Sequence, residues 1–312
     1  MKRSISGIAV IVVGLFLASS LGAQEHGLPN ALRPQAVREW HAMGTSPCAW
    51  WVPLNQPNGQ IDIDGTVQGL RSNGFQCGVF VIEGAGQGNS YDSFQNLLEN
   101  TKDTHIKLWV VIIPPSEGAD SLPYRSDYVE WSRTLAKLSL KYKNFIGFNI
   151  DDIDQDVSVN TFTRSYLREI YTAKQGINPQ FLFVPTVYDL DRTVADRLAG
   201  CVDGVWLWWV NLEKSTGLPS FLENSRYAVE GRFPIYGGVY AQMTSWHKEG
   251  SPQAEVFQQS LEASCKYSDG AIIWQLSLTP ANPLLSVTKT FLPGGSSPYA
   301  AKCGGGKPAA KQ

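Results

Sequence analysis

Short apolar runs alternate with longer amphipathic stretches along most of this chain. The runs are rich in β-branched and aromatic residues and have the length of strands. Each amphipathic stretch can supply the helical crossover that two parallel strands need. The eight runs are CAWWVPL (48–54), CGVFVIE (77–83), IKLWVVII (106–113), FIGFNID (145–151), FLFVPTVY (181–188), GVWLWWV (204–210), FPIYGGVY (233–240) and AIIWQLSL (271–278).

The intervening stretches carry helix signals. Apolar residues recur on one helical face over 128–142, and Asp127 precedes them at the position of a capping residue. Asp191 is expected to begin a helix that Gly200 ends. Ser251, which is followed by a proline, is the predicted start of another helix.

Strand and helix alternate eight times between residues 48 and 293. This pattern predicts an α/β fold, a single closed (βα)8 barrel of the TIM type, which typically takes about 250 residues. The rival is an open doubly wound sheet. The barrel is favoured because the strand count is eight and because the first strand–helix turn lacks a dinucleotide-binding fingerprint.

The two ends of the chain differ from the predicted barrel domain, 48–293. Residues 1–23 have a basic start, an apolar run and a small-residue cleavage site, which indicate a secretory signal peptide. The protein is therefore expected to be secreted or periplasmic, and no later segment is long and apolar enough to be an integral membrane segment. Residues 24–47 form a lead-in. Residues 294–312, rich in Gly, Ser, Pro and Ala, are predicted to be a flexible tail.

The chain has five cysteines, which are expected to lie in an oxidising compartment. Some of them can form disulfides there, and one must remain unpaired because the number is odd. Cys48 and Cys77 begin adjacent strands and could form a disulfide. Cys303 could tether the tail to one of the other four. The cysteines of the chain are Cys48, Cys77, Cys201, Cys265 and Cys303.

Charge and metal-ligand spacing exclude several function classes. The net charge of −2 leaves no electrostatic footprint for nucleic acid or an anionic membrane. The chain has no C-x-x-C, and no two of its four histidines lie at i, i+4. No metal site built on His or Cys and no cofactor is therefore expected. The sequence indicates nothing about oligomeric state.

The fourth run, FIGFNIDDID (145–154), begins as a buried strand and ends in acids. Barrel enzymes build their sites at the carboxyl ends of the strands, so these acids are candidate site residues. Strand alternation predicts that Asn149 and Asp151 face the barrel interior. Asp152 can turn toward a substrate only if the chain bends there. The alternative is that Asp151, Asp152 and Asp154 merely cap the next helix.

Carboxylates, carboxamides and aromatics dominate the other strand ends, and basic residues are nearly absent. This set suits a neutral polyhydroxylated ligand, because carboxylates and amides bind sugar hydroxyls and aromatic faces pack on pyranose rings. Trp274 and one of Trp208 and Trp209 are expected to form a stacking floor. The third run leads into PPSEG with Glu117. The predicted substrate-binding residues are Asn149, Asp154, Asp189, Trp208, Trp209, Asn211, Tyr240, Gln242, Trp274 and Gln275.

The fourth run resembles the fourth-strand signature of family 18 glycoside hydrolases, F-D-G-F-D-I-D-W-E, which ends in the proton donor. The matching residues are Phe145, Gly147, Phe148, Ile150 and Asp151. Trp274 resembles the aromatic that ends the eighth strand there. Asn149 replaces an acid, and Ile153 stands where the catalytic Glu would be, so substrate-assisted chemistry does not carry over. The run also looks like the fourth strand of barrel hydrolases that act on exopolysaccharides.

The sequence thus predicts an exported glycoside hydrolase that cleaves a polysaccharide or oligosaccharide by carboxylate acid/base catalysis. Asp151 is the expected essential carboxylate, Asp152 the favoured proton donor and Glu83 the opposing carboxylate. One alternative is a non-catalytic carbohydrate-binding barrel. Another is a divalent-metal enzyme with Asp151, Asp152 and Asp154 as oxygen ligands.

Overall fold

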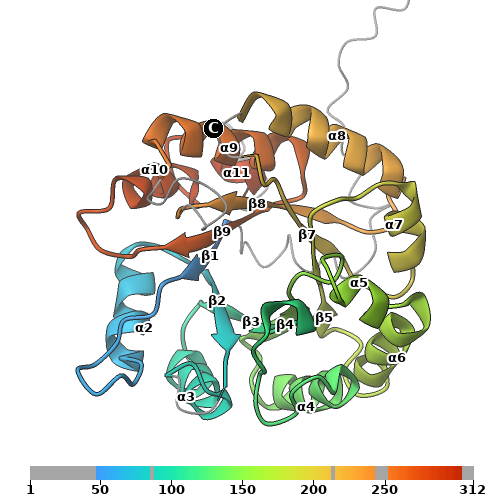
Figure 1. The fold of residues 1–312 in the computed structure, drawn as a ribbon. Helices are drawn as coiled ribbons and strands as arrows, with labels where there is room; N and C mark the ends of the chain where they lie inside the picture. The colour runs from blue at the N-terminus through green and yellow to red at the C-terminus, as the bar shows by residue number, and fades with distance from the viewer. Residues whose placement is uncertain (1–46, 85–87, 212–214, 243–251, 304–312) are drawn as a thin grey trace, which may run out of the picture.

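The computed structural model describes residues 47–84, 88–211, 215–242 and 252–303. The predicted signal peptide and nearly all of the lead-in lie outside these residues. Within them, the strands gather at the centre and the helices surround them (Figure 1). Every strand pair in the sheet is parallel.

The strands follow the eight apolar runs, with the fifth run divided in two. Their order in the sheet is β5-β4-β3-β2-β1-β9-β8-β7-β6. The strands are β1 (Cys48–Trp51), β2 (Cys77–Ile82), β3 (Lys107–Ile112), β4 (Phe145–Ile150), β5 (Leu182–Phe183), β6 (Thr186–Val187), β7 (Val205–Trp208), β8 (Ile235–Tyr240) and β9 (Ala271–Leu276).

The divided fifth run closes the ring. β5 pairs with β4, whereas β6 pairs with β7. Between them, Val184 N donates to Phe148 O at 3.0 Å, and Pro185 O accepts from Trp206 N at 2.9 Å. Pro185 has no N–H to donate, which interrupts the ladder at this point. The predicted closed barrel is confirmed, and the open sheet is wrong.

The helices lie outside the ring (Figure 1). One buried cluster fills the layer between strands and helices, and a second fills the inside of the ring. The α-helices are α2 (Ile63–Ser72), α3 (Tyr91–Thr101), α4 (Tyr128–Lys141), α5 (Ser158–Thr161), α6 (Arg164–Gln175), α7 (Arg192–Leu198), α8 (Leu218–Val229), α9 (Ala254–Tyr267), α10 (Pro283–Phe291) and α11 (Ala300–Cys303).

Three of the predicted helix signals act as expected. The carboxylates of Asp127 and Asp191 accept hydrogen bonds from the third backbone amide that follows each, at 2.9 and 2.8 Å. Gly200 follows α7 with a φ of +72°, a conformation that glycine adopts without strain. Ser251 lies outside the described residues, and the helix that follows it, α9, begins at Ala254 with Gln253 as its N-cap.

Large aromatics fill the ring, and small residues make room for them. Trp50 lies 6.1 Å from Trp206, which lies 5.6 Å from Trp109, between ring centroids. A Cβ on Gly147 would lie 2.3 Å from the Trp109 ring. Gly147 therefore faces the interior, as alternation along the fourth run predicts, and no larger residue fits there. Phe148, next along the strand, belongs to the layer under the helices.

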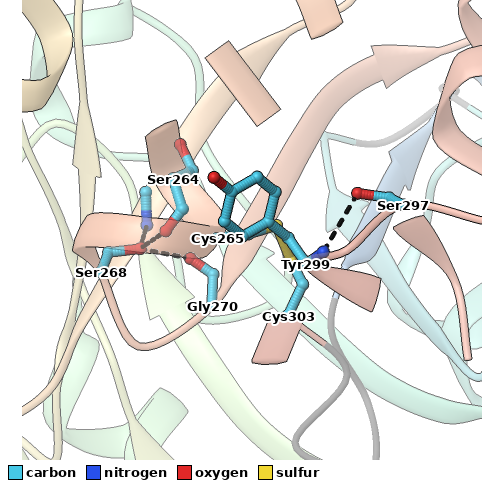
Figure 2. Close-up of a disulfide and its surroundings, with 8 residues drawn as sticks. Ser264, Cys265, Ser268, Gly270, Ser297, Tyr299 and Cys303 are labelled. Carbon is cyan, nitrogen blue, oxygen red and sulfur yellow. Dashed lines mark hydrogen bonds between the residues drawn. A yellow bond between two sulfur atoms is a disulfide. The ribbon is translucent and has the colours of Figure 1, made fainter. Parts of the chain in front are cut away.

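Two disulfides hold the barrel. Cys48–Cys77 links the first residues of β1 and β2, with Cα atoms 4.7 Å apart, which confirms that possible pairing. Cys265–Cys303 ties α11 to α9 (Figure 2). Residues up to Cys303 are thus attached to the barrel, which differs from the flexible tail expected from residue 294. Cys201 is a buried free thiol.

The helices of the described residues are short in comparison with a bilayer. None of them is both long and apolar enough to cross a membrane. Disulfides persist in oxidising compartments, so the two that are present agree with an extracytoplasmic location.

Candidate functional site

The end of the barrel at which the strands finish, here called the mouth, holds the acids of the fourth run. β4 ends at Ile150, and Asp151 N still donates to Ile112 O of β3 at 3.2 Å. Asp152 then adopts a left-handed φ of +45°. For a residue other than glycine this conformation is uncommon and is often kept for a functional reason. The chain bends at Asp152, as the sequence argument required for this side chain to face a substrate.

Because of this bend, two consecutive acids face the same place and meet a third. One carboxylate oxygen from each of Glu117, Asp151 and Asp152 lies within 4.8 Å of the other two. Glu117 ends the short 3₁₀ helix η2 (Pro115–Glu117), which follows β3. The Glu117 residue is exposed overall, but its carboxyl group turns toward the acids after β4. We call these three residues the acidic triad.

Asn149 supports the triad from below. It is fully buried, and its Nδ2 donates to Val184 O at 2.7 Å and to Thr186 Oγ1 at 3.1 Å. The Thr186 hydroxyl in turn interacts with the Asp151 carboxyl and lowers its pKa. Asn149 thus fixes the positions of Val184 and Thr186, where the fifth run is interrupted, and Thr186 in turn binds the Asp151 carboxyl. Its position favours a supporting role over contact with a ligand.

Asp154 makes different contacts from Asp151 and Asp152. Its Oδ2 accepts hydrogen bonds from the backbone amides of Tyr188 and Asp189, at 2.8 and 3.1 Å. It therefore joins the loop after β4 to the loop after β6. Among the described residues, the group that could surround a metal ion contains Glu117 in place of Asp154. The oxygen set of Asp151, Asp152 and Asp154 expected from sequence is not brought together.

The helix-cap explanation of the acids is wrong. The N-cap of α5 is Val157, with no side-chain cap hydrogen bond. The N-cap of α6 is Thr163, whose side chain accepts from Tyr166 N. None of the three acids caps either helix that follows β4.

The pKa values of the triad are raised. Burial, helped by the charges of Asp152 and Glu83, raises the pKa of Glu117 to about 7. Burial, and then the charges of Asp152 and Glu117, raise the pKa of Asp151 well above its usual range. Burial also raises the pKa of Asp152, which the Tyr188 hydroxyl partly offsets. Near neutral pH Glu117 therefore holds a proton for part of the time, which an isolated carboxyl would have lost.

Glu83 lies beside the triad. Its backbone N donates to Asn89 O at 2.7 Å, and a side-chain hydrogen bond with Asn89 lowers the pKa of its carboxyl against the stronger effect of burial. Glu83 follows β2, which pairs with β3, and its charge is among those that raise the pKa of Glu117.

Aromatic rings line the mouth next to the acids. The ring centroid of Tyr240 lies 5.0 Å from that of Trp208 and 5.5 Å from that of Trp274. Tyr188 follows β6 and is close enough to both Asp152 and Tyr240 to influence their pKa values. Trp274 is half-buried, whereas Trp208 is only 2% exposed.

A bulge at the end of β9 affects two predicted site residues. Trp50 pairs with Trp274, but Trp51 pairs with Leu276, so Gln275 is an extra residue. Gln275 has a φ of +52°. Bulges next to active sites often re-aim side chains. Trp274 and Gln275 are both partly accessible, whereas the residues on either side of them are buried.

The remaining predicted site residues lie either away from the mouth or exposed after a strand. Trp209 is directed away from the mouth, because its ring packs on Phe221 of α8 at 5.0 Å. Asp189, Asn211 and Gln242 are exposed directly after β6, β7 and β8. Sequence reasoning noted Glu117 at the third strand end but did not assign it a role. The sequence feature that could have assigned Glu117 to the site is its position just after β3, because β3 pairs with β4, whose end carries the other acids.

Comparison with known proteins shows the fold. No protein-family model and no curated protein sequence matches the chain. The resemblance to family 18 glycoside hydrolases finds no support. The fold is similar to that of an endoglucanase, with a TM-score of 0.57 and 11% identity over 81% of this chain and 99% of that one. It is also similar to that of a hyperthermophilic endo-β-1,4-glucanase in complex with substrate, with a TM-score of 0.54 and 10% identity over 77% of this chain and 91% of that one. A candidate α-L-fucosidase from Bacteroides thetaiotaomicron is similar as well, with a TM-score of 0.55 and 10% identity over 78% of this chain and 90% of that one. The barrel fold is thus shared with glycoside hydrolases.

Proposed function

We propose that this protein is a glycoside hydrolase that cleaves a polysaccharide or oligosaccharide. The observation that carries the proposal is the acidic triad, three carboxyls that converge at the strand ends and whose pKa values burial raises. Glycosidic hydrolysis requires one carboxyl that protonates the leaving oxygen and a second that acts as base or nucleophile. The half-buried ring of Trp274, beside Tyr240, supplies a face on which a sugar can stack.

The structure supports a division of roles within the triad. Glu117 is the proposed proton donor, because its pKa of about 7 keeps it protonated in mildly acidic solution and its exposed position lets water reload it. Sequence reasoning assigned this role to Asp152, whose side chain is more deeply buried. Asp151 is the second carboxyl, held by Thr186 from below. The backbone amide of Asp152 donates to the Asp151 carboxyl, and the Tyr188 hydroxyl binds the Asp152 side chain.

The separation of the carboxyls favours one stereochemical outcome. Retaining glycosidases place the two groups about 5–5.5 Å apart, and inverting enzymes about 6.5–9.5 Å apart. One oxygen of each triad carboxyl lies within 4.8 Å of the other two, below the separation found in inverting enzymes. The proposed reaction therefore retains the anomeric configuration.

Release of reducing sugar from a panel of polysaccharides tests the proposal. Proton NMR of the first product then gives its anomeric configuration, for which retention is expected. The same reactions with EDTA separate this proposal from the divalent-metal alternative, since hydrolysis by carboxyls alone persists in the chelator. A panel in which saccharides bind but none is cleaved would favour the non-catalytic binding barrel.

A further inference from the structure

The loop after β3 carries Glu117 to the mouth on an exposed segment, residues 117–120. The base of this loop is fixed by the buried Ser121, whose Oγ accepts a hydrogen bond from Ile113 N at 2.9 Å and donates one to Ile82 O. At the tip, the 3₁₀ helix η2 has no side-chain cap hydrogen bond, and Glu117 N donates locally to Pro114 O at 3.3 Å. Neither set of contacts aims the Glu117 carboxyl at the other two acids.

The acidic triad is an arrangement that the carboxyls themselves do not favour. One oxygen of each lies within 4.8 Å of the other two. Any two of these groups that are ionised repel each other, and a carboxylate at an exposed position is stabilised by moving into water. Glu117 is the exposed member and lies on a loop, whereas Asp151 directly follows β4. A contact outside the triad is therefore expected to hold Glu117 in place.

Ser158 makes a contact of this kind. It is the first residue of α5, which follows β4, and it is fully buried. Its Oγ donates a hydrogen bond at 3.0 Å to the Oγ of Ser116, the residue before Glu117. This bond joins the loop after β3 to the segment after β4, and these two segments carry the acidic triad. It thereby sets where the tip of the loop lies relative to Asp151 and Asp152.

Ser158 is itself held on both sides. Ser158 N donates to Gln155 O at 2.9 Å, and Gln155 N donates to Asp152 O at 3.2 Å. On the other side, Phe162 N donates to Ser158 O at 2.8 Å. The ring of Phe162 is fully buried and packs on that of Tyr128, with centroids 5.0 Å apart. A hydroxyl fixed in this way by the turn after Asp152 and by the core can hold a partner on an exposed loop.

We propose that Ser158 is the positioning residue for the proton donor, and that its bond to Ser116 keeps the Glu117 carboxyl at Asp151 and Asp152. The proposal rests on the proposed function, in which Glu117 protonates the leaving oxygen. Without the bond, the tip of the loop moves toward water, and the proton is no longer delivered where the glycosidic oxygen lies. A displacement of about 1 Å is enough to cost roughly 10²-fold in rate.

The leaving group of the substrate reveals whether Ser158 acts through Glu117. The substrates are aryl glycosides of the saccharide that the parent releases, for which kcat/KM reports the step in which the aryl group departs. Phenolate is a poor leaving group and needs the proton, whereas dinitrophenolate departs without it. We expect Ser158→Ala to lower kcat/KM about 10- to 100-fold for the phenyl glycoside and less than about threefold for the dinitrophenyl glycoside. In the Glu117→Gln background, Ser158→Ala should change neither value further, because the group that it positions is gone.

Ser132→Ala is the matched control. Ser132 is also fully buried, and its Oγ donates to Ile170 O at 2.6 Å, between α4 and α6 outside the ring of strands. Its replacement should destabilise the protein but leave the ratio of the two rates unchanged. Ser116→Ala, at a less buried position, should reproduce the effect of Ser158→Ala, and it carries the test if Ser158→Ala does not fold.

A crystal structure of Ser158→Ala or Ser116→Ala provides a readout that needs no activity. The Glu117 carboxyl is expected to leave the other two acids, and a carboxyl that stays in place would overturn the inference. So would equal losses on the two glycosides, or a further loss on the phenyl glycoside in the Glu117→Gln background. Failure of the proposed function looks different, because the parent then cleaves no glycoside while the crystal structure still decides whether Ser158 holds Glu117.

Discussion

The side-chain amide of Asn149 donates to the hydroxyl of Thr186 across 3.1 Å, and this contact joins the fourth strand to the broken fifth run directly below Asp151. The same amide donates to Val184 O at 2.7 Å. One buried side chain therefore both closes the barrel and supports the site.

Replacement of Asn149 by Ala should lower the free energy of unfolding by about 1–3 kcal/mol, because two buried acceptors lose their donor. Urea denaturation measures the change. Asn100→Ala, which removes an exposed amide that bonds Asn96 O, is the control and should change stability by less than about 0.5 kcal/mol. Equal effects of the two substitutions would show that Asn149 is not a structural link.

The pKa of Glu117 predicts how stability depends on pH. The folded-state pKa of about 7 lies above the unfolded value of 4.5, so the native state binds more protons between these values. Stability should therefore fall as pH rises from about 4.5 to about 7. Glu117→Gln should make the melting temperature less dependent on pH in this window. Parallel curves for the parent and the variant would contradict the raised pKa.

Trp274 and Trp209 form a matched pair of large aromatics at strand ends. Trp274 borders the mouth, whereas Trp209 packs on α8. Trp274→Ala should weaken saccharide binding about tenfold or more, with a smaller loss of stability than Trp209→Ala. Trp209→Ala should mainly destabilise, because it leaves a cavity between strand and helix. The saccharide affinities of the two folded variants test this prediction. An equal loss of affinity in both would contradict a stacking role for Trp274.

The disulfide between Cys265 and Cys303 leads to a prediction about the end of the chain. Truncation after Pro293 removes α11 and the bond, which closes a loop with a sequence separation of 38. This truncation should cost about 2–4 kcal/mol of stability. Truncation after Cys303 keeps the bond and should cost almost nothing. If the shorter chain unfolds at the same denaturant concentration as the longer one, α11 and the disulfide contribute nothing to stability.

Periodicity and composition were sufficient to predict the barrel, because each strand is buried on both faces and reads as a continuous apolar run. The exception was the fifth run, in which Pro185 interrupts the ladder. Alternation also predicted that Gly147 faces inward. These properties follow from local sequence, which explains why they could be read without a structure.

The site was predicted only in part, because its geometry depends on contacts between distant segments. Sequence placed Asp151 and Asp152 at a strand end, but it could not show the left-handed bend that turns both acids to one side. It could not show that Asp154 binds the amides after β6, or that Glu117 reaches across from the loop after β3. It left open which cysteine Cys303 would pair with, because the disulfide to Cys265 depends on non-local packing.

Asp151 is the residue on which the whole account depends. Asp151→Asn keeps the shape of the side chain and removes its ability to act as a carboxylate, so the most direct measurement is the turnover of this variant on a polysaccharide that the parent cleaves. The account predicts a loss of about 10²–10⁴-fold in kcat, with a melting temperature close to that of the parent. Undiminished turnover by a folded Asp151→Asn protein would contradict the proposed catalytic role of the acidic triad.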